Sequence, residues 1–365
     1  MYLKRLILSD FKSIDSADLT FSPKFNSIIG NNGSGKTNLL DAIWYLSMTK
    51  SFLSSSDQYI YRYGQSEVVL NGLYVKDGDT DERVAIRLRD GSEKILKRND
   101  KQYERLSEHI GEIPVVIVAP TDASLIHDSG EERRRFLNQI ISQIDRQYLR
   151  SIQSYNKILA QRNTLLKSSN PNWDLIDTLS IQLSAVAQYI YEKRAETVQM
   201  LSEKAGVIYE RISGGSENIT LQYHSDLSKS SLHDLLEKAK ERDRVLGYTS
   251  VGVQRDDMTM LMDGYPIRKC GSQGQQKSLQ IALKLSQFDL MKQLTGHTPI
   301  LLLDDVFDKL DMTRVDRLIN IVADDNYGQV FITDSNNILG TEANESKVFR
   351  VIINEGRTII ENGTN

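Results

Sequence analysis

Residues 28–37 read Ile-Ile-Gly-Asn-Asn-Gly-Ser-Gly-Lys-Thr, and this stretch decides the fold. The two apolar residues end an expected strand at Gly30, and apolar residues recur at helical spacing from 39 to 46. A strand, a glycine-rich loop and a helix therefore follow one another, which is the context that the pattern G-x-x-x-x-G-K-[ST] requires. The sequence predicts a P-loop that binds ATP and Mg²⁺.

The residue types of the loop suit this chemistry. Glycines let successive backbone N–H groups point at phosphates, and the N-terminus of the following helix adds a positive end. Lys36 is expected to reach the β- and γ-phosphates as a catalytic residue, and Thr37 is expected to ligate Mg²⁺. The expected nucleotide-binding residues are Gly30, Asn31, Asn32, Gly33, Ser34, Gly35, Lys36, Thr37 and Asn38.

A second apolar run ends in two acids. Ile300 to Leu303 has the length and composition of a buried strand, and Asp304 and Asp305 follow it. A carboxylate at such a strand end can hold Mg²⁺ beside a P-loop, which we expect of Asp304. Asp305 is expected to orient or deprotonate the attacking water as a catalytic residue. Alone, the two acids are typical of a strand that enters a turn, so this interpretation depends on the P-loop.

Ser272, Gly274 and Gln275 open a helix expected from Gln273 to Leu294. They offer a hydroxyl, free N–H groups and a positive helix end to a phosphate. A capping box of Ser272 and Gln275 would use the same residues. Two interpretations therefore stay open: an ordinary helix cap, or a binding site for the nucleotide of a second subunit.

The periodicity changes twice along the chain. Residues 1–125 contain the P-loop and an antiparallel pattern with a turn at Asp90-Gly91, and residues 126–244 are helical with a break at 168–172. Residues 174–212 are long enough for one helix of roughly 55 Å. Residues 245–365 return to strands and helices. We predict an α/β nucleotide-binding domain, 1–125 and 245–365, split by an antiparallel helical arm lobe, 126–244.

Composition bounds the compartment and the partners. No apolar run approaches the roughly 20 residues of a membrane span, and no signal-peptide pattern is present, so we expect a cytoplasmic protein without a membrane partner. The single cysteine, Cys270, is expected to be buried, and the five histidines lack the spacing of metal ligands. The net charge of −4 argues weakly against DNA, although Arg133, Arg134 and Arg135 could face DNA or form intramolecular ion pairs.

Further motifs, kept in order over most of the chain, resemble a known family. They are Ala119-Pro-Thr-Asp122, Arg134-Arg-Phe-Leu137, Tyr155-Asn-Lys-Ile-Leu159, Gln161-Arg-Asn163, Gly252-Val-Gln-Arg-Asp-Asp257 and Lys309-Leu-Asp311. Together with the P-loop, the Ser-x-Gly-Gln signature and the Asp-Asp strand end, they resemble the ABC-type ATPase heads of chromosome-maintenance proteins, and among these the RecF family. Gln254 and Lys309 stand where that family usually has histidine and glutamate.

The resemblance implies an ABC-type ATPase head that forms a homodimer on ATP, with each nucleotide held between one subunit's Gly30 loop and the other's Ser272 signature. It also implies DNA binding at single-stranded gaps and duplex junctions, in recombinational repair and replication restart, with RecO and RecR as partners in loading RecA. Asp305 replaces the glutamate of most transporters, which implies slow hydrolysis suited to a switch.

Other functions remain open at this point. A nucleotide-binding subunit of a membrane transporter shares the loop, the signature and the acid pair, but the fuller Leu-Ser-Gly-Gly-Gln is absent and no histidine follows Thr333. A P-loop kinase of a small molecule would use the helical region as a lid. A longer coiled-coil relative is disfavoured, because the helical insert is short and carries no Cys-x-x-Cys hook.

Overall fold

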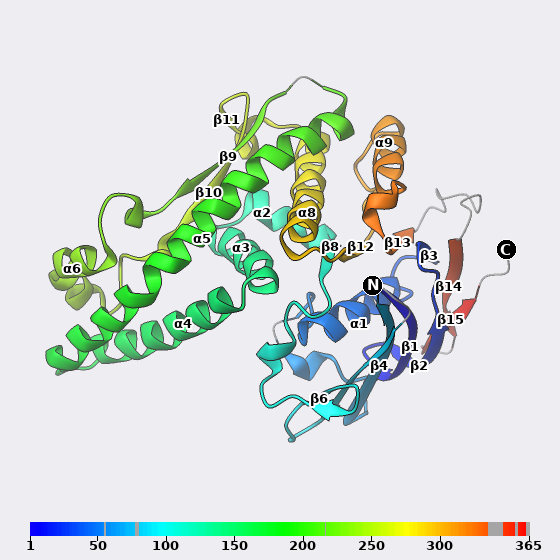
Figure 1. Ribbon diagram of the computed structural model, residues 1–365, viewed down its shortest axis with the longest axis horizontal. Coiled ribbons are helices and arrows are strands. Elements are labelled where there is room, and N and C mark those ends of the chain that lie inside the picture. The colour runs from blue at the N-terminus through cyan, green and yellow to red at the C-terminus, as the bar shows by residue number, and fades with distance from the viewer. Residues whose placement is uncertain (55, 77–79, 216, 335–345, 355–356, 363–365) are drawn as a thin grey trace. The chain divides into compact units, whose positions relative to one another are not determined.

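The computed structural model describes residues 1–54, 56–76, 80–215, 217–334, 346–354 and 357–362 (Figure 1). The chain divides into two compact units, the first formed by Met1–Asp122 and Gln287–Asn365 and the second by Ala123–Ser286. Residues 245–286 pack within the second unit, whereas the predicted domain division assigns them to the head. Their assignment to a functional domain stays a prediction.

The first unit is built on a mixed sheet that has twelve strands among the described residues, in the order β7-β6-β5-β4-β1-β2-β15-β14-β3-β13-β12-β8. One end of this order, from β7 to β2, is antiparallel, and the other, from β14 to β8, is parallel. The strands are β1 (Tyr2–Phe11), β2 (Ile14–Thr20), β3 (Phe25–Ile29), β4 (Glu67–Lys76), β5 (Thr80–Arg89), β6 (Ile95–Arg98), β7 (Lys101–Gln102), β8 (Val115–Val118), β12 (Ile300–Leu303), β13 (Val330–Asp334), β14 (Ser346–Asn354) and β15 (Arg357–Asn362).

The predicted elements of the first unit are confirmed. β5 and β6 form the expected hairpin, in which Val84 pairs with Arg98, and the left-handed Gly91 (φ +68°) lies between the two strands. The strand and helix around the glycine loop are β3 and α1 (Lys36–Met48). The apolar residues of α1 are buried in the same core as the apolar faces of β1, β4 and β5. Helix α9 (Met312–Val322) begins at Asp311, whose side chain accepts a hydrogen bond from the Arg314 N–H.

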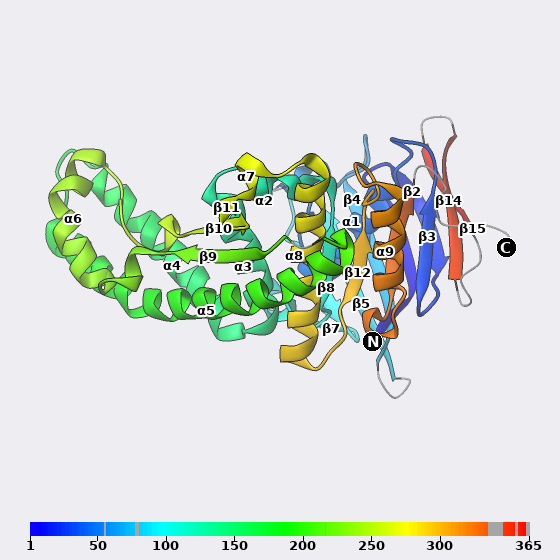
Figure 2. The same cartoon turned by 90° about the horizontal axis from the view of Figure 1, so that it is seen from above.

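The second unit is mostly helical (Figure 2). It contains α2 (Ser124–His127), α3 (Gly130–Ile144), α4 (Arg146–Leu166), α5 (Trp173–Ser213), β9 (Ile219–His224), α6 (Leu232–Leu246), β10 (Asp257–Met262), β11 (Tyr265–Pro266), α7 (Ile267–Cys270) and the start of α8 (Gln273–Thr295). Asn172 caps α5 by accepting from the Leu175 N–H at 3.1 Å, directly after the break predicted at 168–172. The long arm helix is confirmed, since α5 has 41 residues and packs along α4.

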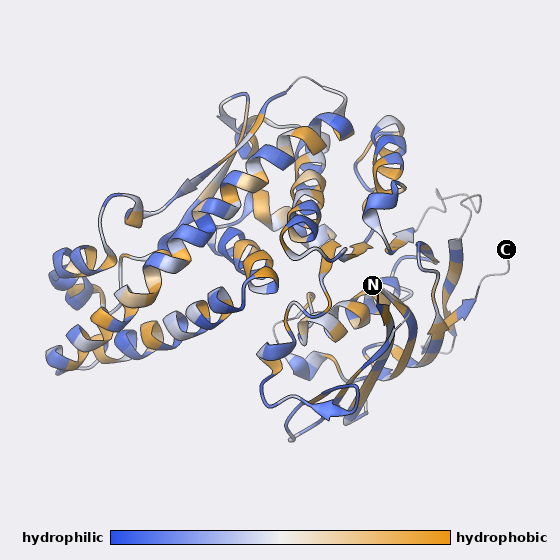
Figure 3. Cartoon of the chain, in the orientation of Figure 1, coloured by the Kyte–Doolittle hydropathy of each residue, from blue (hydrophilic) through white to orange (hydrophobic). Residues whose placement is uncertain are grey.

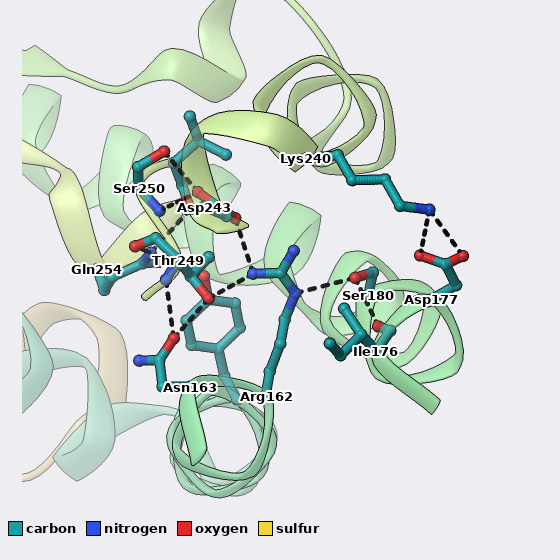
Figure 4. Close-up of polar contacts among 12 residues, drawn as sticks. Arg162, Asn163, Ile176, Asp177, Ser180, Lys240, Asp243, Thr249, Ser250 and Gln254 are labelled. Carbon is teal, nitrogen blue, oxygen red and sulfur yellow. Dashed lines mark hydrogen bonds and ion pairs between the residues drawn. The ribbon is translucent and has the colours of Figure 1, made fainter. Parts of the chain in front are cut away.

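A buried arginine ties the helices of the arm together (Figure 4). Arg162 of α4 donates to Ser180 Oγ on α5 at 3.0 Å, to Asp243 Oδ2 on α6 at 2.8 Å and to Thr249 Oγ1 at 2.7 Å. The Arg162 and Asp243 side chains are almost completely buried. Because a buried charge is tolerated only when it is paired and hydrogen-bonded, this cluster fixes the three helices in one arrangement.

Apolar residues are interspersed with polar ones along the arm helices (Figure 3). Where apolar residues recur every three or four positions, they lie on one face of the helix, which can pack against its neighbours. In the part of the chain that the structure describes, no helix is both long enough and apolar enough to cross a membrane.

One expectation was wrong: Cys270 is exposed, not buried. It ends the short helix α7, which directs Ile267 inward and leaves the following residues at the surface.

Candidate nucleotide-binding site

The glycine loop has backbone geometry that only glycine supplies without strain. Gly33 and Gly35 have φ of +79° and +107°, in the left-handed region. A Cβ built on Gly35 would lie 2.8 Å from Thr358 Oγ1, and one on Gly30 would lie 2.3 Å from the Val351 carbonyl oxygen. The loop is therefore closely packed against β14 and β15.

Lys36 lies within this loop. Its ammonium donates to the carbonyl oxygens of Gly30 at 2.8 Å and Asn31 at 3.0 Å, and the residue is 4% exposed. Thr358 Oγ1 donates to the Ser34 carbonyl at 2.9 Å, while the buried Ser34 hydroxyl has no hydrogen-bond partner among the residues that the structure describes. A buried cation and an unsatisfied hydroxyl in a glycine-rich loop before a helix N-terminus suit a bound polyphosphate.

Asp304 lies beside the P-loop, as we expected from the sequence, and contacts Thr37. The Thr37 hydroxyl lies 3.0 Å from each carboxylate oxygen of Asp304, and Thr333 Oγ1 lies 2.9 Å from Asp304 Oδ1. Burial raises the pKa of Asp304, and the hydrogen bonds from Thr333 and Thr37 oppose that rise. A carboxylate and a hydroxyl on adjacent elements are the hard oxygen donors that Mg²⁺ prefers, so these residues fit the metal.

Asp305 is half-buried and follows in an unusual conformation. Its φ is +42°, left-handed for a residue with a side chain, and its N–H donates to Thr333 Oγ1 at 2.8 Å. Such a backbone conformation persists only where surrounding contacts hold it, and it is common at active sites. Asp305 thus lies directly after the residue that would bind the metal.

The signature residues lie in the second unit. Ser272 Oγ accepts from the Gln275 N–H at 3.2 Å, and Gln275 Oε1 accepts from the Ser272 N–H at 2.8 Å. This is the capping box that one of the two interpretations anticipated. Gln275 also donates to Glu217 at 2.9 Å, whereas Ser272 is exposed. The cap does not exclude a phosphate-binding role, since a capped helix start still presents N–H groups.

The three consecutive arginines of α3 differ in their surroundings. Arg133 forms a bidentate pair with Asp257, at 2.7 and 3.0 Å, and its side chain is 11% exposed. Arg134 donates to the Asp256 carbonyl at 2.8 Å. Arg135 is 66% exposed and pairs with Glu131 and Glu132, two acids one turn away on its own helix. Of the three, Arg135 presents its guanidinium to solvent.

Sequence reasoning missed Thr333 and Thr358. Both lie on late strands and contact the loop or the acid pair from positions far away in the chain. The signal available for Thr333 was a polar residue at the end of the apolar strand Val330–Asp334, which runs parallel to the strand that ends at Asp304. Because parallel strands end at the same edge of a sheet, the two residues could have been paired.

A glycine loop of this geometry, at the edge of a mixed sheet and with a carboxylate held against its threonine, is characteristic of P-loop ATPases, and the chain belongs to that class. Residues 2–107 match a family model described as the RecF/RecN/SMC N terminal domain. A solved SMC head, bound to the C-winged helix domain of ScpA, shares the fold with a TM-score of 0.62 at 15% identity over 100% of this chain and 98% of that one.

Closer matches identify the family. A DNA replication and repair protein RecF of Parabacteroides distasonis is 46% identical over 92% of each chain. Another, of Porphyromonas gingivalis, is 44% identical over 92% of this chain and 93% of the relative. The structure of a recombination mediator protein RecF with ATP, from the RecFOR pathway, has a TM-score of 0.89 at 28% identity over 100% of this chain and 98% of that one. The chain therefore belongs to the RecF family, which confirms the sequence resemblance and the α/β fold class.

Proposed function

We propose that this chain binds ATP with Mg²⁺ and uses slow hydrolysis to control its binding to DNA in recombinational repair and replication restart. The observation that carries the proposal is the contact of the Thr37 hydroxyl with both carboxylate oxygens of Asp304 at 3.0 Å. It brings together, from positions 267 residues apart, two groups that we expect to bind the metal. Family membership supports the DNA part, and favours neither a transporter subunit nor a small-molecule kinase.

The residues of the site have distinct roles in this proposal. Lys36 would exchange its two carbonyl acceptors for β- and γ-phosphate oxygens, which offer stronger, charge-assisted hydrogen bonds. Thr37 and Asp304 would hold Mg²⁺, which when bound neutralises charge on the phosphates. Asp305 would orient or deprotonate the attacking water. Its short side chain is the reason that we expect slow turnover.

The signature serves a homodimer in this proposal. Ser272, Gly274 and Gln275 would bind the γ-phosphate of ATP held on a second copy, so that ATP joins two subunits. The exposed Ser272 and the start of α8 support this role, because their N–H groups and helix dipole attract an anion. DNA at single-stranded gaps or junctions would then bind the dimer, with RecO and RecR as partners, as the RecFOR description of the solved relative suggests.

The arginine run keeps a place in this proposal through Arg135. Arg133 and Arg134 already serve contacts inside the second unit, so alanine at all three positions would mix folding effects with DNA effects. We propose Arg135 as the DNA contact. Arg135→Ala should weaken DNA binding and reduce the salt dependence, the slope of log K against log salt, by about one unit.

The proposed function is tested by light scattering of the protein with Mg²⁺ and ATP, ADP or no nucleotide, repeated with gapped duplex DNA. Of the three conditions, only ATP should produce a dimer, and that dimer should retain the DNA. Lys36→Met should remain a monomer, whereas Lys4→Met, which changes an exposed lysine of β1, should behave like the unmodified chain. A monomer in every condition, without retained DNA, would overturn the proposal.

A further inference from the structure

Strand β13 ends between the two strands that carry the site. Thr333 pairs in register with Ile28 of β3, two residues before the glycine loop. On its other side β13 runs parallel to β12, where Leu303 pairs with Ile332, directly before Asp304. Thr333 is completely buried. Its side chain is thus fixed at the sheet edge that the P-loop and the acid pair share.

The Thr333 hydroxyl makes two hydrogen bonds of opposite sense. It donates to Asp304 Oδ1 at 2.9 Å and accepts from the Asp305 N–H at 2.8 Å. A hydroxyl has a single hydrogen, so both of its roles are specified and its torsion is set. One side chain therefore orients a carboxylate and holds the next backbone amide.

The contact with Asp304 has a particular consequence for the metal. Thr37, which also contacts Asp304 through its hydroxyl, is itself an expected Mg²⁺ ligand, so its contact with Asp304 would change if it bound the metal. Thr333 reaches Asp304 from outside the expected ligand set, and can hold the carboxylate in both situations. Groups that orient a metal-binding side chain in this way typically change metal affinity or activity by about 10- to 100-fold when removed.

The contact with Asp305 restrains its backbone. Asp305 has a left-handed φ of +42°, which is unfavourable for a non-glycine residue, and a specific acceptor at its N–H favours that conformation. The direction of the Asp305 side chain depends on this backbone. A single hydroxyl therefore couples the orientation of the two acids.

We infer that Thr333 is a positioning residue for the acid pair: it aims Asp304 at Mg²⁺ and holds Asp305 in its left-handed conformation. This inference rests on the proposed ATPase function. It attributes the effect to the hydroxyl and not to the volume of the side chain. A serine at position 333 should therefore preserve the function of the threonine. A valine, which has the same shape but no hydroxyl, should lose it.

The test measures magnesium dependence in Thr333→Val, Thr333→Ser and a matched control. The control is Ser47→Ala, which removes another buried hydroxyl of the first unit, one bonded to the Ile113 carbonyl at the far end of α1. A fluorescent ATP analogue is titrated in EDTA and in Mg²⁺, and ATP turnover is measured against Mg²⁺ concentration. Thr333→Ala, which places no methyl group against Asp304, is used if the valine variant does not fold.

We expect Thr333→Val to bind nucleotide in EDTA within about twofold of the unmodified chain. It should need about tenfold more Mg²⁺, both for the gain in nucleotide affinity and for half-maximal turnover. Thr333→Ser and Ser47→Ala should retain the unmodified magnesium dependence. An unchanged dependence in Thr333→Val, or an equal loss in Thr333→Ser, would overturn the inference and leave the ATPase function standing. An unmodified chain that binds no nucleotide would overturn the proposed function, and this inference with it.

Discussion

The buried arginine of the long arm helix offers the sharpest test of what holds the second unit together. Arg194 on α5 donates to Asp256 Oδ2 at 2.9 Å, the Val253 carbonyl at 2.6 Å, Asn138 Oδ1 at 3.0 Å and the Tyr148 hydroxyl at 3.0 Å. Both charged side chains are almost fully buried, at 2% and 1% exposed. Arg194→Met would keep the aliphatic stem and remove every one of these donors.

The expected loss of stability follows from the partner that stays behind. Removing one member of a buried ion pair typically costs about 3–5 kcal/mol, because the remaining charge is buried without compensation. Asp256 is that charge here. Adding Asp256→Asn to the arginine variant should recover about 2 kcal/mol, since the uncompensated charge is then gone. The matched control is Lys193→Met on the same helix, whose exposed pair with Glu196 should contribute less than about 1 kcal/mol.

Urea unfolding followed by tryptophan fluorescence can isolate the second unit. The chain has two tryptophans, Trp44 in α1 and Trp173 at the start of α5, so a Trp44→Phe background leaves one reporter. The transition of Trp173 should move to much lower urea in Arg194→Met and stay almost unchanged in Lys193→Met. If both variants lay within about 1 kcal/mol of each other, the assumption that the buried pair holds these elements together would be wrong.

Three further perturbations test the first unit. Gly35→Ala should abolish nucleotide binding, measured by titration, because its Cβ meets Thr358; Gly64→Ala has a similar φ of +80° but open space and should bind normally. Burial lowers the pKa of His109, so the unfolded state takes up a proton at a higher pH than the folded state. Below about pH 6.5 the free energy of unfolding should therefore fall by up to about 1.4 kcal/mol per pH unit. His109→Gln should flatten this slope in urea titrations followed by Trp44 fluorescence. Asp305→Asn should retain ATP binding, slow hydrolysis by about 100-fold or more and prolong the dimer; unchanged hydrolysis in a phosphate-release assay would contradict its assigned role.

The sequence sufficed for those parts of the site whose geometry is local. The glycine loop is local, because positive φ at Gly33 and Gly35 and the helix that starts at Lys36 are properties of adjacent residues. The strand that ends before Asp304 was likewise predicted from its run of apolar residues. The long arm helix was predicted for the same reason, since neither proline nor a turn signal interrupts residues 174–212.

What the sequence did not provide was the set of contacts made across the sheet. Thr358 reaches the Ser34 carbonyl from 324 residues away, and only the strand order brings β15 under the loop. The arginine run was undecided for a related reason. Whether Arg133 meets DNA or an acid depends on where β10 places Asp257, and no periodicity within α3 contains that information.

The motif Gly252–Asp257 is best explained by packing. Its two consecutive acids each bind an arginine from a different helix: Asp256 binds Arg194 of α5, and Asp257 binds Arg133 of α3. Gln254 donates to the Val251 carbonyl at 2.8 Å and accepts from the Tyr155 hydroxyl on α4. A neutral histidine, usual in the family at this position, has one donor and one acceptor, and an amide supplies both without titrating near neutral pH. Gln254 thus links α4 to the loop before β10, and the motif joins α3, α4 and α5 to the segment that precedes β10.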